Sequence, residues 1–176
     1  MINRLSVTQK LVLSFAFVII VGSILLSLPI SHYANSPETS YLDHLFNTVS
    51  MVCVTGLSVV PVSKAYNGFG QIISMLLMQT GGLGLVSLIA FSTYTLKNKL
   101  GLSDQDLLQS ALSRDTQKNL KAYLFKVYKI TFSIEAMASL VIMTDFIPRF
   151  GLGHGIFNSL FLAVSAFCNA GFDNLG

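Results

Sequence analysis

Two long runs without a charged residue constrain this chain more than any other feature of its sequence. Residues 11–30 carry no charge over 20 residues, and none of the 32 residues between Lys64 and Lys97 is charged. A helix of about 20 apolar residues crosses the roughly 30 Å hydrocarbon core of a bilayer. Only 11% of the chain is charged, against about 25% in a soluble domain. We therefore expect a protein embedded in the lipid bilayer, and the composition argues against a soluble enzyme or a nucleic acid-binding protein.

Charged and polar residues divide the chain into three expected crossings. The first, residues 11–30, is longer than the apolar region of a secretory signal peptide, which has about 7–15 residues. The second covers residues 68–96 and the third residues 122–147, with Asp145, Pro148 and Arg149 at the end of the third. Between them, residues 97–121 are polar and form the main solvent-facing loop. Within this loop Ser103 is placed to cap a short amphipathic helix.

Basic residues are distributed unevenly between the two sides of these crossings. If the N-terminus and residues 97–121 are cytoplasmic, nine of the 11 Lys and Arg residues lie on or near that side. The nine are Arg4, Lys10, Lys97, Lys99, Arg114, Lys118, Lys121, Lys126 and Lys129. Cytoplasmic loops carry an excess of Lys and Arg. The sequence therefore predicts a multi-pass protein of the cytoplasmic membrane with its N-terminus in the cytoplasm.

Two shorter apolar stretches, residues 41–61 and 155–176, do not fit ordinary crossings. The first has both ends on the outer side, so it enters and leaves on the same face or lies on the surface. Residues 43–56 align without gaps with residues 158–171 at an offset of 115, and six of the 14 pairs are identical. The shared pattern is L-F-x-x-V-S-x-x-C-x-x-G. The sequence therefore contains an internal repeat centred on these stretches.

Each repeat consists of a helix, a re-entrant segment and a helix, so successive copies start on the same side of the membrane. Many secondary transporters contain inverted repeats instead. Parallel units around an axis favour a pore. The predicted fold class is an all-α polytopic membrane protein built from parallel helix–pore loop–helix repeats, as in potassium channels.

A pore loop requires a short helix that ends inside the bilayer and an extended backbone that returns. Residues 42–54 give about 20 Å of helix at 1.5 Å per residue. The C-terminal end of a helix carries partial negative charge, which favours a cation there. Backbone carbonyls can then replace the hydration shell of the ion. Gly56 and Gly171 stand where the chain has to turn.

These motifs resemble a known family of membrane proteins. The sequences V-C-V-T-G-L at residues 52–57 and F-C-N-A-G-F at residues 167–172 resemble the first and second filter loops of the Trk/Ktr/HKT potassium transporters. The sequence Q-T-G-G-L-G at residues 79–84 is similar to the glycine-rich second helix of the same family. Within the family, the chain resembles the KtrB-type membrane subunit of bacterial Ktr systems.

The resemblance implies four such repeats in one chain, related by pseudo-fourfold symmetry. Residues 1–121 would then be the first repeat with its cytoplasmic loop. Residues 122–176 would be the first helix and pore loop of the second. One and a half of four repeats would be present, so we expect an N-terminal fragment of a longer protein.

The resemblance also implies which groups bind the ion. Carried over by position, the potassium-binding carbonyls belong to Val54, Thr55, Gly56, Asn169, Ala170 and Gly171. The second loop has Asn169 and Ala170 where the first has Val54 and Thr55, so the equivalence of the loops is imperfect. No metal other than the transported K⁺ and no covalently bound cofactor is expected, while Na⁺ would serve as a coupling ion.

The implied partners are the remaining repeats of the same protein, a second copy in a homodimer, and a cytosolic nucleotide-binding ring of the KtrA or TrkA type. The implied function is potassium uptake, and we expect no enzymatic activity. Two alternatives remain open at this point: an ion-coupled secondary carrier, and a truncated fragment that is inactive alone.

Two acidic residues are further candidates. Glu135 lies inside the third crossing, where an ionisable residue is a functional hypothesis by default; a structural partner on a neighbouring helix is the alternative. Asp173 follows the second loop and would raise the cation concentration at the outer mouth, or else cap the backbone that follows.

The remaining polar motifs favour structural roles. Gly81, Gly82 and Gly84 do not fit a dinucleotide-binding motif, because the third glycine of G-x-G-x-x-G would fall on a serine. Cys53 and Cys168 occupy matching repeat positions without nearby histidines, so we expect both to pack behind the loops. For His32, His44 and His154 we expect surface or capping positions and no metal site.

Overall fold

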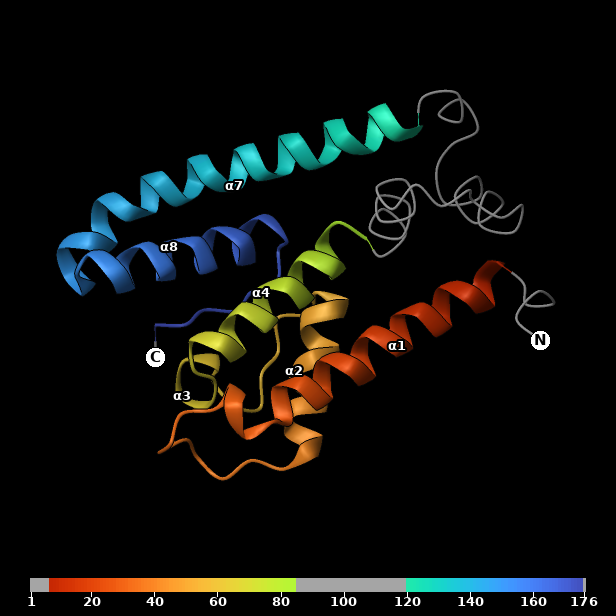
Figure 1. The fold of residues 1–176 in the computed structure, drawn as a ribbon, viewed down its shortest axis with the longest axis horizontal. Coiled ribbons are helices and arrows are strands. Elements are labelled where there is room, and N and C mark those ends of the chain that lie inside the picture. The colour runs from red at the N-terminus through yellow and green to blue at the C-terminus, as the bar shows by residue number, and fades with distance from the viewer. Residues whose placement is uncertain (1–6, 85–119, 176) are drawn as a thin grey trace.

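The computed structural model describes residues 7–84 and 120–175, and these residues are helical with connecting loops. The helices, in chain order (Figure 1), are α1 (Val7–Ser27), the 3₁₀-helix η2 (Pro29–Ser31), α2 (Tyr41–Cys53), α3 (Val62–Ala65), α4 (Gly68–Gly82), α7 (Leu120–Phe150) and α8 (Leu152–Phe167). The described part contains no β-strand, although His32 and Tyr66 form an isolated antiparallel bridge. The expected all-α class is therefore confirmed for the described part.

Helix α4 occupies the centre of the arrangement. It packs against α1 and α2 on one side and against α8 on the other (Figure 1). Leu26 of α1, Met51 of α2 and Met78 of α4 are fully buried in one core, which Phe161 of α8 also joins. Burying each such side chain contributes roughly 1.5–3 kcal/mol. The core thus holds α8 against the N-terminal helices despite the long separation in sequence.

Helix α2 begins with a capping box. Ser40 Oγ accepts a hydrogen bond from the backbone N–H of Asp43, and the Asp43 carboxylate accepts one at 2.8 Å from the backbone N–H of Ser40. This reciprocal pairing satisfies two donors that a helix N-terminus leaves without partners. It sets the start of α2 at Tyr41, one residue before the expected start at residue 42.

Helices α7 and α8 form an antiparallel hairpin (Figure 1). Gly151 connects them with φ of 79°, a conformation that favours glycine. A Cβ atom on Gly155 would lie 2.8 Å from the Cα of Ile147, so the glycine lets α8 approach α7 closely. Most of the helix contact of α7 is with α8.

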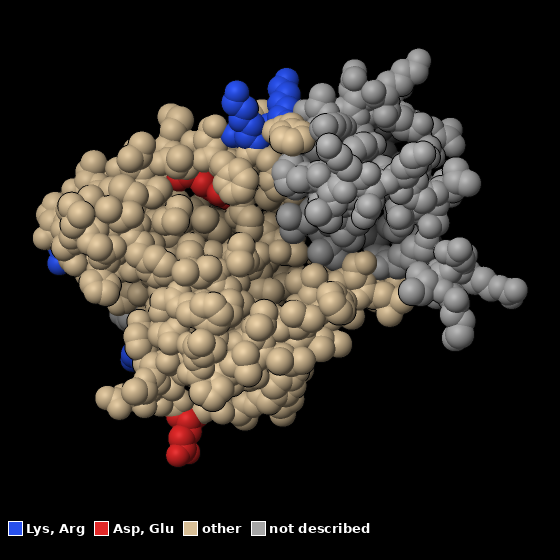
Figure 2. Space-filling view, in the orientation of Figure 1, with Lys and Arg blue, Asp and Glu red and all other residues tan. Residues whose placement is uncertain are grey.

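Among the described residues, one helix, Phe125–Phe150, is long and apolar enough to cross a membrane. The apolar parts of α1 and α8, Val12–Ser27 and Leu152–Phe167, are shorter. Large apolar side chains are exposed along α1 and α7, among them Phe17, Met137 and Val141. On the face shown in Figure 2 the described residues are almost all uncharged, with acidic atoms visible in a hollow beneath α7. Such a surface suits contact with lipid or with other apolar segments.

The helix bounds differ from expectation at three places. The first crossing was expected over residues 11–30, but α1 ends at Ser27 and η2 begins at Pro29. The second crossing was expected over residues 68–96; α4 ends at Gly82, Gly84 has φ of 77°, and residues 85–96 lie outside the described part of the chain. A glycine in this conformation is common just after a helix. The third helix continues past Asp145 to Phe150, with Pro148 inside its final turn and an Arg149–Asp145 ion pair at 2.9 Å across it. The loop at residues 97–119, including the cap expected at Ser103, lies outside the described residues.

Candidate functional site

The candidate site begins where α2 ends. Val54 caps the helix in the left-handed conformation, with φ of 57° and ψ of 44°. A β-branched residue rarely adopts positive φ, and such strained conformations are concentrated at functional sites. The backbone N–H groups of Val54 and Thr55 both donate to the carbonyl of Ser50, the latter at 3.0 Å. The chain therefore folds back onto the last turn of α2 before it leaves.

The loop after α8 has the same geometry at the positions related by the repeat. Asn169 has φ of 54° and Gly171 has φ of 71°, against 57° at Val54 and 75° at Gly56. The N–H of Ala170 donates to the carbonyl of Ser165 at 2.8 Å, as that of Thr55 does to Ser50. The sequence repeat at offset 115 is therefore also a repeat of backbone conformation, despite the change to Asn169-Ala170.

A serine one turn from the end of each helix holds the returning backbone. Ser50 Oγ accepts the N–H of Leu57 at 2.9 Å, and Ser165 Oγ accepts the N–H of Phe172 at 2.9 Å. Sequence reasoning assigned no role to either serine. The signal that could have found them is that both belong to the shared pattern L-F-x-x-V-S-x-x-C-x-x-G.

Asparagine side chains hold the outer parts of the loops in different ways. Buried Asn47 donates to the carbonyl of Val60 at 2.8 Å and accepts the N–H of Val59 at 3.0 Å. In the second loop, Asn174 donates to Gln71 of α4 at 2.9 Å and to Asn158 of α8 at 3.0 Å. Asn174 thus connects the second loop to α4 as well as to α8, the helix that precedes the loop.

The backbone carbonyl oxygens of the six predicted site residues are the polar groups of the loops that accept no hydrogen bond from other described residues. The N–H groups described above point back toward the helices, and no hydrogen bond between described residues ends on these carbonyl oxygens. The six residues are Val54, Thr55, Gly56, Asn169, Ala170 and Gly171. Unpaired carbonyl oxygens are acceptors, so the arrangement is suited to coordinating a cation.

The two loops meet at their repeat-equivalent glycines. A Cβ atom on Gly171 would lie 3.1 Å from the Cα of Gly56, and one on Gly56 would lie 3.3 Å from the carbonyl oxygen of Ala170. Both glycines have positive φ. The fold therefore places Gly56 of the first loop against Ala170 and Gly171 of the second, from segments 115 positions apart.

Two adjacent glycines of α4 make room for the two loops. A Cβ on Gly81 would overlap the carbonyl oxygen of Val52, at the end of α2, and one on Gly82 would lie 2.6 Å from Cys168 Sγ. Small residues of this kind allow close packing of membrane helices. Cys168 is buried as expected, but Cys53 is exposed. The expectation that both cysteines pack behind the loops is therefore wrong for Cys53: Gly82 of α4 packs against Cys168, whereas the Cys53 side chain is exposed.

The two acidic candidates have local partners. Glu135 is 3% exposed, and its Oε1 accepts a hydrogen bond from Gln79 Nε2 at 2.8 Å. Asp173 is exposed and accepts the N–H of Leu175 at 3.0 Å. Glu135 therefore has the neighbouring-helix partner that the sequence left open, and Asp173 caps a short turn.

The sequence matches one known protein family over nearly its whole length. The profile of TrkH, described as a cation transport protein, matches residues 6–176. The chain belongs to the TrkH family.

Three relatives of this TrkH family chain are named for ion uptake. The Ktr system potassium uptake protein B of Bacillus subtilis is 38% identical over 176 residues, which cover 98% of this chain and 39% of the relative. The potassium/sodium uptake protein NtpJ of Enterococcus hirae is 36% identical, covering 99% of this chain and 38% of the relative. The Ktr system potassium uptake protein B of Vibrio alginolyticus is 35% identical, covering 92% and 35%. The chain thus spans about two-fifths of the length of these relatives.

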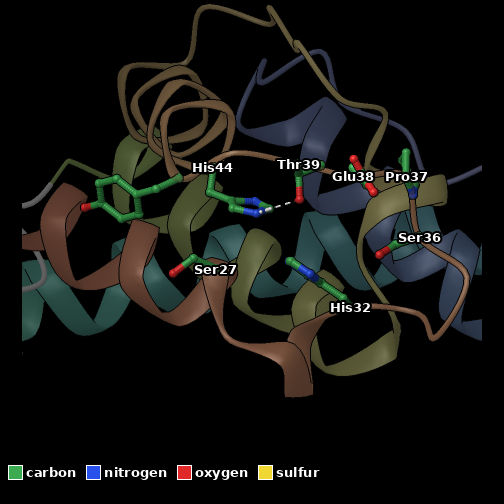
Figure 3. Close-up of a pocket in the computed structure, with 8 residues that line it drawn as sticks. Ser27, His32, Ser36, Pro37, Glu38, Thr39 and His44 are labelled. Carbon is green, nitrogen blue, oxygen red and sulfur yellow. Dashed lines mark hydrogen bonds between the residues drawn. The ribbon is translucent and has the colours of Figure 1, made fainter.

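A second polar feature of this TrkH family chain lies at the start of α2. His44 is 2% exposed, with Nδ1 3.0 Å from the Tyr66 hydroxyl and Nε2 3.0 Å from Thr39 Oγ1. The ring centroids of His44 and His32 are 4.7 Å apart, with the rings tilted by 33°, and both residues line a pocket of about 440 Å³ (Figure 3). Burial lowers the pKa of His44, and the nearby His32 lowers it further. The expected surface or capping position is wrong for His44, because Ser40 caps α2, the His44 side chain is buried, and both ring nitrogens have hydrogen-bond partners.

The described residues contain no cluster of three or more His, Cys, Asp or Glu side chains placed to hold a metal ion. The polar groups gathered at the loops are backbone carbonyls.

Proposed function

We propose that this chain provides two of the loops that line a potassium uptake path in a Ktr-type transporter. The ion is coordinated by the carbonyls of Val54, Thr55 and Gly56 in the first loop and of Asn169, Ala170 and Gly171 in the second. The observation that carries this proposal is the paired geometry of the loops: their N–H groups donate to the helices while their carbonyls have no described donor.

Helix orientation supports a cation as the ligand. Both α2 and α8 end directly at the loops, at Cys53 and Phe167. The C-terminal end of a helix carries about half a negative elementary charge. Two such ends favour a positive ion near the loops and disfavour an anion. The proposal needs no charged side chain at the coordinating positions.

In the proposed arrangement each loop belongs to a helix–pore loop–helix repeat. Residues 1–121 form the first repeat, and residues 122–176 form the first helix and pore loop of the second. Two loops in contact make one side of an enclosure, and the remaining repeats of the protein complete it. The N-terminus lies in the cytoplasm, as the distribution of Lys and Arg favours.

The names of the relatives support the ions and partners of this proposal. The Enterococcus hirae relative is named for potassium and sodium, which agrees with Na⁺ as a coupling ion here. Two relatives are named as parts of Ktr systems. We extend this to a homodimer that sits on a cytosolic nucleotide-binding ring. Asp173 lies at the outer mouth, where its charge attracts cations.

Complementation tests the proposal. The full-length protein that contains this chain is expressed in cells that lack their own potassium uptake. We expect growth at low external K⁺ to be restored. Replacing Gly171 with Asp, which adds a side chain at a positive φ, should abolish growth, while Gly153→Ala, at a site with nothing within 4 Å, should not. Growth that is indifferent to Gly171→Asp, at equal protein levels, would reject the proposal.

A further inference from the structure

A chain of side-chain hydrogen bonds connects the second loop to α7 through α4. Gln79 of α4 accepts a hydrogen bond from the Cys168 thiol, with Sγ 3.3 Å from Oε1. The amide group of the same side chain donates to Glu135 of α7 at 2.8 Å. One carboxamide thus uses both its acceptor and its donor to join two elements that are distant in sequence.

The carboxylate of Glu135, at the other end of these hydrogen bonds, is costly to bury. Glu135 is 3% exposed and lies in the segment Phe125–Phe150, the candidate membrane span. An ionisable residue at such a position faces the protein interior and requires a partner. Glu135 lies on the same face of α7 as buried Thr131 and Ser139, four residues before and after it. This buried polar face is turned inward, and the described partner of Glu135 is Gln79.

At the second loop, this chain of hydrogen bonds ends on Cys168, whose position is constrained by both Gly82 and Gln79 of α4. Cys168 directly precedes Asn169, the left-handed residue that opens the second loop. A Cβ on Gly82 would lie 2.6 Å from Cys168 Sγ and 2.9 Å from its Cα, so α4 touches the loop there. Gln79 and Gly82 are three residues apart and share one face of α4. Gly82 determines how closely the second loop approaches α4, and Gln79 determines the direction of the Cys168 thiol.

Within residues 7–84 and 120–175, the first loop has no counterpart of this connection. Cys53 occupies the repeat-equivalent position but is exposed. The two loops have the same backbone geometry, and among the described residues the hydrogen-bond chain is found at the second one. Because the loops touch at Gly56 and Gly171, a shift of the second loop would change the spacing of carbonyls contributed by both.

We propose that Gln79 is a positioning residue for ion selectivity, which holds the second loop in register by bridging Cys168 to Glu135. This inference rests on the proposed function, since it assumes that the loops coordinate K⁺. Gln79 does not touch the ion. It acts through Cys168 on the position of the Asn169 and Ala170 carbonyls, and Glu135 orients its amide.

The test compares variants of the full-length protein reconstituted in liposomes, with the K⁺ to Na⁺ permeability ratio as the readout. Gln79→Leu has a similar volume but no donor or acceptor. We expect it to lower the ratio by about tenfold, the factor that 1.4 kcal/mol carries. Thr80→Val is the matched control, because the Thr80 hydroxyl donates to the Leu76 carbonyl of its own helix. It should leave the ratio unchanged.

Conservative variants separate positioning from simple loss of stability. Cys168→Ser keeps a donor toward Gln79 and should retain the ratio within about twofold, whereas Cys168→Ala should lower it as Gln79→Leu does. If Gln79→Leu does not fold, the comparison of these two cysteine variants decides. A ratio for Gln79→Leu, or for Cys168→Ala, within twofold of the unmodified protein would overturn the inference. A lack of K⁺ selectivity in the unmodified protein would instead reject the proposed function.

Discussion

Gly56 and Gly171, 115 residues apart, are in contact: a Cβ atom on Gly171 would lie 3.1 Å from the Cα of Gly56. Both adopt positive φ, and both follow a helix that ends one turn after a serine. The contact joins two segments of similar sequence through the same backbone conformation. The expected consequences of this arrangement can be measured.

The serines that hold the loops should be sensitive to substitution. Ser50→Ala leaves the N–H of Leu57 without its acceptor, and Ser165→Ala does the same to Phe172. The bond to Phe172 is buried, where an unsatisfied donor costs about 1–3 kcal/mol; the bond to Leu57 is part-buried, so its loss costs less. We expect each variant to have a lower thermal midpoint and slower K⁺ uptake than the unmodified protein. Ser58→Ala, at an exposed serine of the first loop, is the control, and an equal effect in all three would contradict this role.

The glycines of α4 should not tolerate a methyl group. In Gly82→Ala the new Cβ would lie 2.6–2.9 Å from three atoms of Cys168, so the second loop or α4 has to move. Overpacking of this kind costs about 1–3 kcal/mol. We expect reduced stability and uptake, measured by thermal unfolding and by ion flux. Gly153→Ala, with nothing within 4 Å of the added atom, should be neutral; if Gly82→Ala is equally neutral, the close approach is not required.

Acid should destabilise the region around His44. Burial and the neighbouring His32 lower the pKa of His44 below its ordinary 6.5, while Asp43 opposes them weakly. Below about pH 6.5 the unfolded chain takes up a proton that the folded protein does not, so stability falls as the pH falls. We expect the thermal midpoint of the protein to drop between about pH 7.5 and about pH 5.5. His44→Gln, which does not titrate, should have a smaller drop, and an identical drop would contradict the prediction.

The helices and the loop positions could be predicted because their signals are local. The helix expected at residues 42–54 is present as α2, Tyr41–Cys53, since the apolar spacing is readable in sequence; its role as a pore helix stays a prediction. The equivalence of Gly56 and Gly171 follows from an ungapped repeat. The six proposed carbonyl positions depend on that repeat and on family resemblance, so they remain a prediction about ion binding.

The remaining features depend on tertiary contacts that a repeat does not encode. Cys53 and Cys168 occupy equivalent positions in the repeat, yet among the described residues Cys168 is packed against Gly82 and bonded to Gln79, while Cys53 is exposed. Burial of His44 depends on Tyr66, which lies 22 positions away and supplies a partner for Nδ1. Neither contact has a periodic signal, so the sequence alone favoured the more common structural roles.

The central claim is that the loop carbonyls select K⁺, and the most direct measurement is the K⁺ to Na⁺ permeability ratio of the full-length Gly56→Ser variant in liposomes. At φ of 75° a side chain is strained, and its Cβ would lie 3.3 Å from the Ala170 carbonyl oxygen. The carbonyls must therefore shift, and we expect the ratio to fall by about tenfold or more. Gly68→Ala, at a site with nothing within 4 Å, should keep the ratio. An unchanged ratio in correctly folded Gly56→Ser protein would contradict the account.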